Sequence, residues 1–184
     1  MIFNSHSRLD GKHAFLSPSQ HSWTNYDEVK LMNRYYASNA ARRGSDLHVL
    51  ASRAITLGVQ LNRSEGVLAA YVNDAIKYKM KPEQPLFYSE NCFGTTDAIS
   101  FRRNKLRIHD LKSGITHTKE RQLEVYAALF CLEYQVDPYQ IDIELRIYQG
   151  EDIRKFHPHP DLIAGLMDRI VYFDQLIEEF KLSA

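Results

Sequence analysis

The sequence has few of the features that mark several large classes of protein. Its two cysteines, Cys92 and Cys131, are too few for a tetracysteine zinc site or a four-cysteine iron–sulfur site. No apolar run approaches the roughly eighteen residues that indicate a membrane span. The opening residues MIFNSHSRLDGKH also lack the apolar segment of a signal peptide. We therefore expect a cytoplasmic protein.

The chain also lacks an excess of charge of either sign. Lysine and arginine together number 23, as do aspartate and glutamate, so the formal net charge is zero. This balance excludes a uniformly basic protein that wraps nucleic acid, although it allows local basic patches. No internal repeat or low-complexity linker interrupts the 184 residues, of which 44% are hydrophobic. We predict an irregular polar arm over residues 1–25 and a single domain over 26–184.

Apolar periodicity predicts the elements of an α/β protein. Apolar residues at three- to four-residue spacing indicate helices, and alternation indicates half-buried strands. Helices are predicted over residues 26–41, 44–57, 64–80, 118–134 and 161–182. Strands are predicted over 84–91 and 140–148 and as a hairpin within 94–114, while the HPHP segment before the last helix is predicted as a loop. This order favours a mixed β-sheet flanked by helices, with extra N-terminal helices and a C-terminal helix.

The predicted hairpin within residues 94–114 gathers charged side chains at one end. If its strands pair about the polar turn in its middle, Asp97 and Asp110 reach the same end. Because side chains alternate along a strand, Asp110 and Lys112 project from one face, with the Leu111 carbonyl oxygen close to them. Two neighbouring carboxylates repel each other unless a cation offsets their charge, and hard oxygen ligands suit Mg²⁺ or Mn²⁺. The hairpin therefore predicts a divalent metal site.

Four short motifs, taken in order, resemble the RecB-like branch of the PD-(D/E)XK nuclease superfamily. They are a helical His48, GxxD at residues 94–97, DxK with a following glycine at 110–114, and QxxxY at 122–126. The resemblance covers residues 44–149 and implies a restriction-endonuclease-like core, αβββαβ. The chain is similar to the small stand-alone, phage-type exonucleases of this branch. This similarity implies that the protein acts in a bacterial or phage-infected cell.

The resemblance also implies a metal-dependent deoxyribonuclease. His48, Asp97, Asp110 and the Leu111 carbonyl would hold one or two Mg²⁺ or Mn²⁺ ions over the scissile phosphate. A metal ion in this position polarises the phosphoryl oxygen and activates a bound water. Hydrolysis of DNA phosphodiester bonds is the expected activity, with Asp97 and Asp110 counted among the catalytic residues.

Four further residues receive catalytic roles through the same resemblance. Lys112 would orient or deprotonate the attacking water, or hydrogen-bond the developing charge. Gln122 and Tyr126 would position Lys112 or a phosphate oxygen from a helix face. Glu90 would supply an extra carboxylate, through water or as a ligand of a second metal.

The expected partner is DNA, bound as single strands or at duplex ends. Basic residues predicted to contact its phosphates are Arg42, Arg43, Arg102, Arg103, Lys119 and Arg121. Nothing resembles a sequence-reading module, so we expect an exonuclease that acts on ends or single strands in recombination, repair or phage DNA processing. A homo-oligomer or a recombination partner protein stays open.

Two other functions remain open from sequence. One is a non-catalytic DNA-binding or protein-interaction module on the same fold, and the other is a metal-dependent hydrolase of nucleotides or small phosphoesters. Structural roles also exist for the individual residues: His48 taken alone is more typical of a hydrogen-bonded histidine at the edge of a core. Asp110 and Lys112 taken alone are more typical of a solvated pair on a strand.

Overall fold

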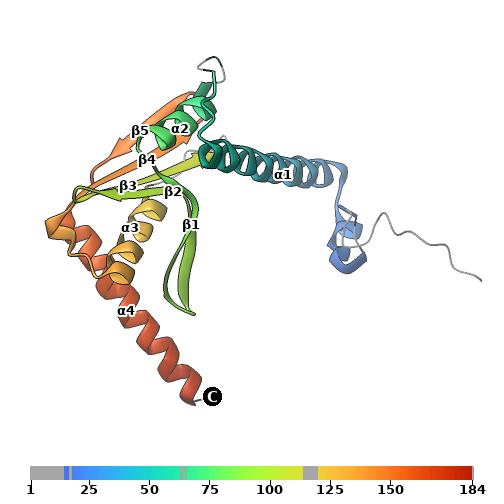
Figure 1. The fold of residues 1–184 in the computed structure, drawn as a ribbon. Coiled ribbons are helices and arrows are strands. Elements are labelled where there is room, and N and C mark those ends of the chain that lie inside the picture. The colour runs from blue at the N-terminus through green and yellow to red at the C-terminus, as the bar shows by residue number, and fades with distance from the viewer. Residues whose placement is uncertain (1–14, 17, 63, 65, 114–119, 184) are drawn as a thin grey trace, which may run out of the picture. The chain divides into compact units, whose positions relative to one another are not determined.

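The computed structural model describes residues 15, 16, 18–62, 64, 66–113 and 120–183 (Figure 1). The chain divides into two units, Met1–Arg43 and Gly44–Ala184. Within the first unit, the structure describes a 3-10 helix, η2 (Pro18–Asn25), and the beginning of the long helix α1 (Glu28–Leu57). The predicted irregular arm is therefore partly helical, and its residues 1–14 lie outside the described part. None of the described helices is long and apolar enough to cross a bilayer.

The second unit contains a five-stranded mixed sheet, which confirms the predicted α/β class. The strands are β1 (Lys81–Ser89), β2 (Cys92–Arg102), β3 (Lys105–Lys112), β4 (Asp142–Gln149) and β5 (Asp152–Phe156), and they lie in this order across the sheet. Strands β1, β2 and β3 run antiparallel, β3 and β4 run parallel, and β4 and β5 form an antiparallel hairpin. A parallel pair needs a crossover connection, and α3 (Arg121–Tyr134) provides it between β3 and β4.

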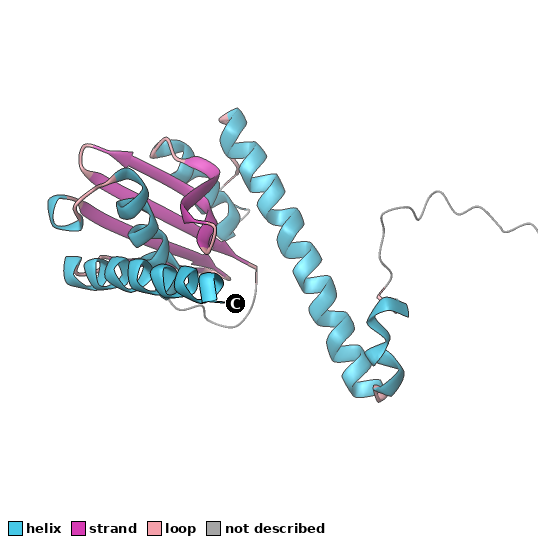
Figure 2. Cartoon of the chain, turned by 90° about the horizontal axis from the view of Figure 1, so that it is seen from below, coloured by secondary structure: helices cyan, strands magenta, loops and turns pink. Residues whose placement is uncertain are grey.

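Helices cover both faces of the sheet (Figures 1 and 2). On one face, α3 and α4 (Pro160–Ser183) bury apolar residues that include Leu123, Ala127 and Ile163 against Ile108 and Leu145. On the other face, α2 (Gly66–Lys77) and the end of α1 bury residues that include Ala51, Ile55 and Val72 against Ala98, Leu111 and Tyr148. Successive strand residues point to opposite faces, so each strand supplies both cores.

Helix α1 is continuous, so the predicted break between helices 26–41 and 44–57 was wrong. Gly44, which lies at that expected break, is buried within the helix. A Cβ atom at Gly44 would lie 2.7 Å from the Ser113 hydroxyl oxygen. The glycine is therefore explained by close packing against the end of β3, and a single glycine costs a helix only about 0.5–1 kcal/mol.

Strands β1 and β5 differ from the sequence prediction. β1 begins at Lys81 instead of residue 84, because the preceding helix, α2, ends at Lys77 instead of residue 80. Prolines are tolerated in β1 because it is an edge strand and need not donate every ladder hydrogen bond. Residues 152–156, predicted as part of a loop, form β5 after a turn in which Gly150 has a φ of 64°. The early start of β1 matters for the site, because it places Glu83 within the strand.

A buried carboxylate, Glu144 on β4, holds several cations at one end of the sheet. Its side chain is 3% exposed, and its oxygens lie 2.7 Å from Arg146, 3.2 Å from Lys155 and 3.4 Å from Lys105. Burial alone would raise the pKa of Glu144, but the hydrogen bonds and charges of Lys155 and Arg146 outweigh it and lower the pKa to about 2. The folded state therefore binds the ionised form of Glu144 preferentially.

Glu144→Gln should lower the free energy of unfolding by about 3 kcal/mol at neutral pH, because it leaves buried cations without their partner. Since the folded pKa lies below the ordinary 4.5, this stabilisation is present above pH 4.5 and is lost as the pH falls toward 2. Urea unfolding of both proteins across this range measures the difference. Glu151→Gln, at an exposed turn position, is the control. An equal loss at every pH, or the same loss in the control, would contradict this account.

Candidate metal centre

Three side chains from three elements converge at one edge of the second unit. His48 on α1, Glu83 on β1 and Asp97 on β2 each offer one ligand atom, and these atoms all lie within 4.8 Å of one another. The pairing of β1 with β2 explains the arrangement. Pro82 pairs with Ala98 and Gln84 with Thr96, so Glu83 and Asp97 lie across from each other.

Asp97 connects this group to the rest of the sheet. One carboxylate oxygen lies 3.4 Å from His48 Nδ1, and the other accepts a hydrogen bond from the Leu111 N–H at 2.8 Å. The carboxylate is partly exposed, whereas the Leu111 side chain is fully buried on the far face of the sheet. Asp97 is therefore fixed by a backbone group of β3 and also faces a histidine of α1.

Asp110 and Lys112 lie next to this group on β3. Ala98 pairs with His109, so Asp97 and Asp110 lie at the same end of the hairpin, as its turn predicts. Asp110 is 3% exposed, and its Oδ1 lies 3.0 Å from Lys112 Nζ. Its Oδ2 is buried and has no hydrogen-bond partner among the described residues. An unpartnered buried carboxylate oxygen is costly, so it marks a place where a ligand would relieve the cost.

The pKa values of Asp110, Glu83 and His48 are all raised above their ordinary values. Burial and then the nearby Asp97 charge raise the pKa of Asp110, and the same two causes in the same order raise the pKa of Glu83. The hydrogen bond to Asp97 raises the pKa of His48 in spite of the opposing effect of burial. Negative charge is therefore in excess at this site, which favours bound protons or a bound cation.

The donor set fits a divalent cation. It combines an imidazole nitrogen with carboxylate oxygens, which suit Mn²⁺ and, for the oxygens, Mg²⁺. Asp110 precedes Leu111 on β3, and its unpartnered Oδ2 would add a further hard ligand. The described residues therefore contain a possible metal site whose ligands are His48, Glu83 and Asp97.

Two residues of α3 approach the same strands. Gln122 accepts a hydrogen bond from Lys112 Nζ at 3.2 Å. The ring of Tyr126 packs against Gly94 of β2 so closely that a Cβ atom on the glycine would lie 2.9 Å from Tyr126 Cε1. Gln122 is thus in contact with Lys112, while the Tyr126 ring packs against β2, the strand that carries Asp97.

Glu90 is not brought to the cluster. Ser89 pairs with Cys92, so Glu90 lies in the turn between β1 and β2 and is exposed. Asp97 follows Cys92 by five residues, which corresponds to about 16 Å along the strand. The extra carboxylate near Asp97 is Glu83 instead, and the sequence prediction missed it because it placed the start of the strand after this residue. The signal available in the sequence was an acid between two prolines that are typical of an edge strand.

The predicted phosphate contacts are spread over the chain. The side chains of Arg42 and Arg43, and the whole of Lys119, lie outside what the structure describes. Arg121 is exposed and forms an ion pair with Glu124 at 3.1 Å. Arg102 is the last residue of β2, five residues beyond Asp97, and Arg103 lies in the turn between β2 and β3.

Comparisons with known proteins add little to this geometry. No protein family and no curated protein matches the chain. A solved structure described as "Crystal structure of SSO0001" is 12% identical, and the alignment covers 82% of this chain and 68% of that one with a TM-score of 0.36. A similarity at this level carries no argument about fold or function, so the site is interpreted from its own residues.

Mn²⁺ should bind the protein at a single major site, and Glu83→Gln or Asp97→Asn should weaken binding at least tenfold because each removes a charged ligand. Isothermal titration calorimetry measures this directly. Glu90→Gln should bind Mn²⁺ like the unmodified protein, which discriminates between the two acids. Equal weakening by all three variants would mean that the effect is general electrostatics and would contradict the site.

Mn²⁺ affinity should also depend on pH. A ligand must lose its proton to bind metal, and the pKa values of His48 and Glu83 are both raised. Affinity should therefore rise with pH and be lost as the pH falls through these raised values. Titrations at several pH values, with folding verified by circular dichroism at each, measure the trend, and an affinity independent of pH would contradict it.

Gly94→Ala should destabilise the protein by about 1–3 kcal/mol, because the new methyl group overlaps the Tyr126 ring. In a double-mutant cycle, Tyr126→Leu should remove most of this loss. Gly165→Ala in α4 is the matched control, since nothing lies within 4 Å of its added carbon. Thermal unfolding measures all four variants. A loss that persists in the Tyr126→Leu background would show that the ring is not the cause.

Proposed function

We propose that the protein is a Mg²⁺- or Mn²⁺-dependent deoxyribonuclease that hydrolyses phosphodiester bonds at DNA ends or in single strands. The observation that supports this proposal is the convergence of His48, Glu83 and Asp97 beside the buried Asp110 and its partly exposed partner Lys112. The resemblance of the sequence motifs to RecB-like PD-(D/E)XK nucleases points to the same chemistry. Recombination, repair or phage DNA processing is the proposed setting.

His48, Glu83 and Asp97 would hold the metal ion, with Asp110 as an additional oxygen ligand. A divalent cation bound there supplies positive charge that polarises a phosphoryl oxygen and lowers the pKa of a coordinated water. The protein's contribution is to keep these donors fixed. Asp97 is held by the Leu111 N–H, and Asp110 is held by burial and by Lys112.

Lys112 is positioned to contact a phosphate oxygen or the attacking water. An ammonium group has three N–H donors. Asp110 at 3.0 Å and Gln122 at 3.2 Å account for two of them and orient the group. The third donor of the partly exposed ammonium is available to stabilise charge that develops on the phosphate. Gln122 is therefore proposed as a positioning residue.

The cost of this arrangement disfavours a non-catalytic module. Asp110 is buried with an oxygen that no described residue satisfies, and the charge of the nearby Asp97 raises the energy of its ionised state further. A fold that only binds DNA or protein gains nothing from this cost. A smaller phosphoester is the alternative substrate for the same metal chemistry, so the experiment includes a chromogenic phosphodiester beside DNA.

The test is cleavage of end-labelled linear and covalently closed circular DNA, single- and double-stranded, with Mg²⁺, Mn²⁺ or chelator. The protein should degrade linear DNA only with metal. Lys112→Ala should reduce the rate on the order of 10²-fold or more, since it removes a donor to the developing charge. Asp168→Asn, an exposed acid on α4, is the control and should cleave normally.

The alternatives give different results in the same assay. Nicking of the circles would show an endonuclease. Hydrolysis of a chromogenic phosphodiester without loss of any DNA would contradict the substrate assignment, and DNA binding without cleavage under either metal would contradict an enzyme.

A further inference from the structure

Strand β2 extends beyond the end of its neighbour β1. Their pairing ends where Lys81 meets Ile99, whereas β2 continues to Arg102. The outer edge of β2 over its last three residues is therefore not covered by β1. A pocket of about 410 Å³ lies at this edge.

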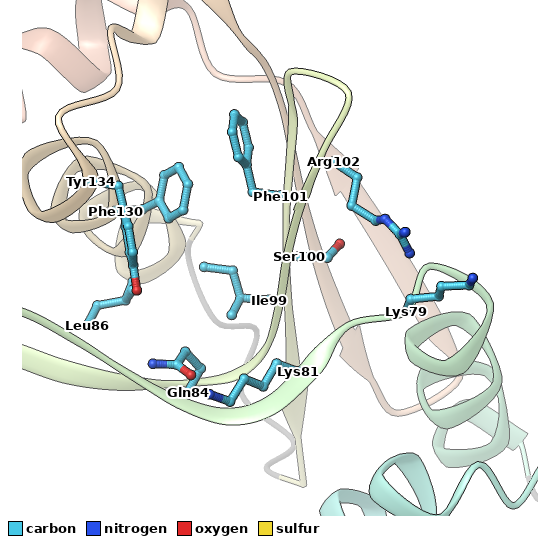
Figure 3. A pocket seen from close by; sticks show the side chains of 10 residues that line it. All are labelled: Lys79, Lys81, Gln84, Leu86, Ile99, Ser100, Phe101, Arg102, Phe130 and Tyr134. Atoms are coloured by element: carbon cyan, nitrogen blue, oxygen red, sulfur yellow. The ribbon is translucent and has the colours of Figure 1, made fainter.

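One side of this pocket is apolar and aromatic. Figure 3 shows Ile99, Phe101, Phe130 and Tyr134 together on the α3 side of β2. The ring centroids of Phe101 and Phe130 lie 5.1 Å apart, and those of Phe130 and Tyr134 lie 4.9 Å apart. Phe101 is 39% exposed and Tyr134 is 51% exposed, so both rings are accessible from solvent. Ser100 also lines the pocket, and its buried hydroxyl has no partner among the described residues.

The other side of the pocket is cationic and continues into a second pocket of about 420 Å³. Lys79 and Arg102 lie on the opposite side of β2 from the rings in Figure 3, and they line both pockets. The remaining residues of the second pocket are Lys77, Tyr78, Arg103, Lys105 and Arg107. Among the described residues, no acidic side chain lines either pocket, in a chain whose formal charge is zero.

The positive charge of the second pocket is only partly neutralised. Lys105 lies 2.7 Å from Asp142, and Arg107 lies 3.5 Å from Glu144. Lys79, Arg102 and Arg103 are exposed, and no described acid forms an ion pair with them. Three free cations beside exposed aromatic rings complement a ligand that carries phosphates and flat, uncovered base faces.

We propose that the two adjoining pockets form a binding site for single-stranded nucleic acid. A base stacks on Phe101 and Tyr134, and the flanking phosphates contact Lys79, Arg102 and Arg103. A duplex is a poorer match because its base faces are already stacked on each other. This inference rests on the proposed function only to explain why the protein binds a single strand.

The site is separate from the metal centre but lies on the same strand. Arg102 follows Asp97 by five residues along β2, which corresponds to about 16 Å. The pockets would therefore hold the substrate at a distance from the scissile phosphate and would contribute to binding more than to the chemical step.

The experiment measures binding of a fluorescein-labelled oligothymidine by anisotropy, in chelator, at several salt concentrations. Phe101→Leu should weaken binding roughly tenfold through lost stacking. Lys79→Asn with Arg102→Gln should weaken it and reduce the slope of log K against log salt by about 1.4, since each single-strand phosphate contact contributes about 0.7. Asparagine suits position 79 because Lys79 has a φ of 52°.

Arg169→Gln, an exposed arginine on α4 that lies 5.5 Å over the Phe173 ring, is the matched control and should bind normally. Circular dichroism verifies that each variant folds. Unchanged binding by the Lys79/Arg102 and Phe101 variants would overturn the site, and equal affinity for a duplex of the same length would overturn the preference for single strands.

Failure of this inference is distinguishable from failure of the proposed nuclease activity. The binding assay contains no metal, so normal binding without cleavage would leave the pockets assigned and contradict the nuclease. Metal-dependent cleavage with unchanged binding by the variants would support the nuclease and contradict the binding site.

Discussion

The site depends on the Asp97 carboxylate more than on any other single group. It accepts the Leu111 N–H of β3, faces His48 of α1 and lies across from Glu83 of β1. A helix and the two strands that flank β2 therefore meet at one side chain. Because its negative charge also raises the pKa values of Glu83 and Asp110, the same group that organises the site makes it favourable for a cation.

The charged groups around Glu144 and around Asp97 are balanced differently. At Glu144, several cations surround one carboxylate, and the group is stable as folded. Around Asp97, several carboxylates share one histidine and one lysine, and an oxygen of Asp110 is left without a partner. The first arrangement is what a structural network requires. The second has more negative than positive charge and an unpartnered oxygen, and a bound cation would compensate both. We therefore assign function to it.

Local signals in the sequence predicted the hairpin and the gathering of Asp97, Asp110 and Lys112, because a two-residue turn fixes the register of its strands. Arg103 and Asn104 have φ values of 51° and 54°, as such a turn requires. Glu83 and β5 were missed because edge strands are defined by pairing with a distant neighbour, and their own pattern is weak. The adjoining pockets could not be predicted, since Lys79 and Phe130 come to line one pocket only through the packing of distant elements on the sheet.

The proposed chemistry depends most on metal binding by His48, Glu83 and Asp97. Anomalous diffraction from crystals soaked in MnCl₂ tests it most directly. We expect one strong anomalous peak in contact with His48, Glu83 and Asp97, and no such peak in crystals of Asp97→Asn. A peak elsewhere, or ordered side chains at this site without a peak at saturating Mn²⁺, would contradict it.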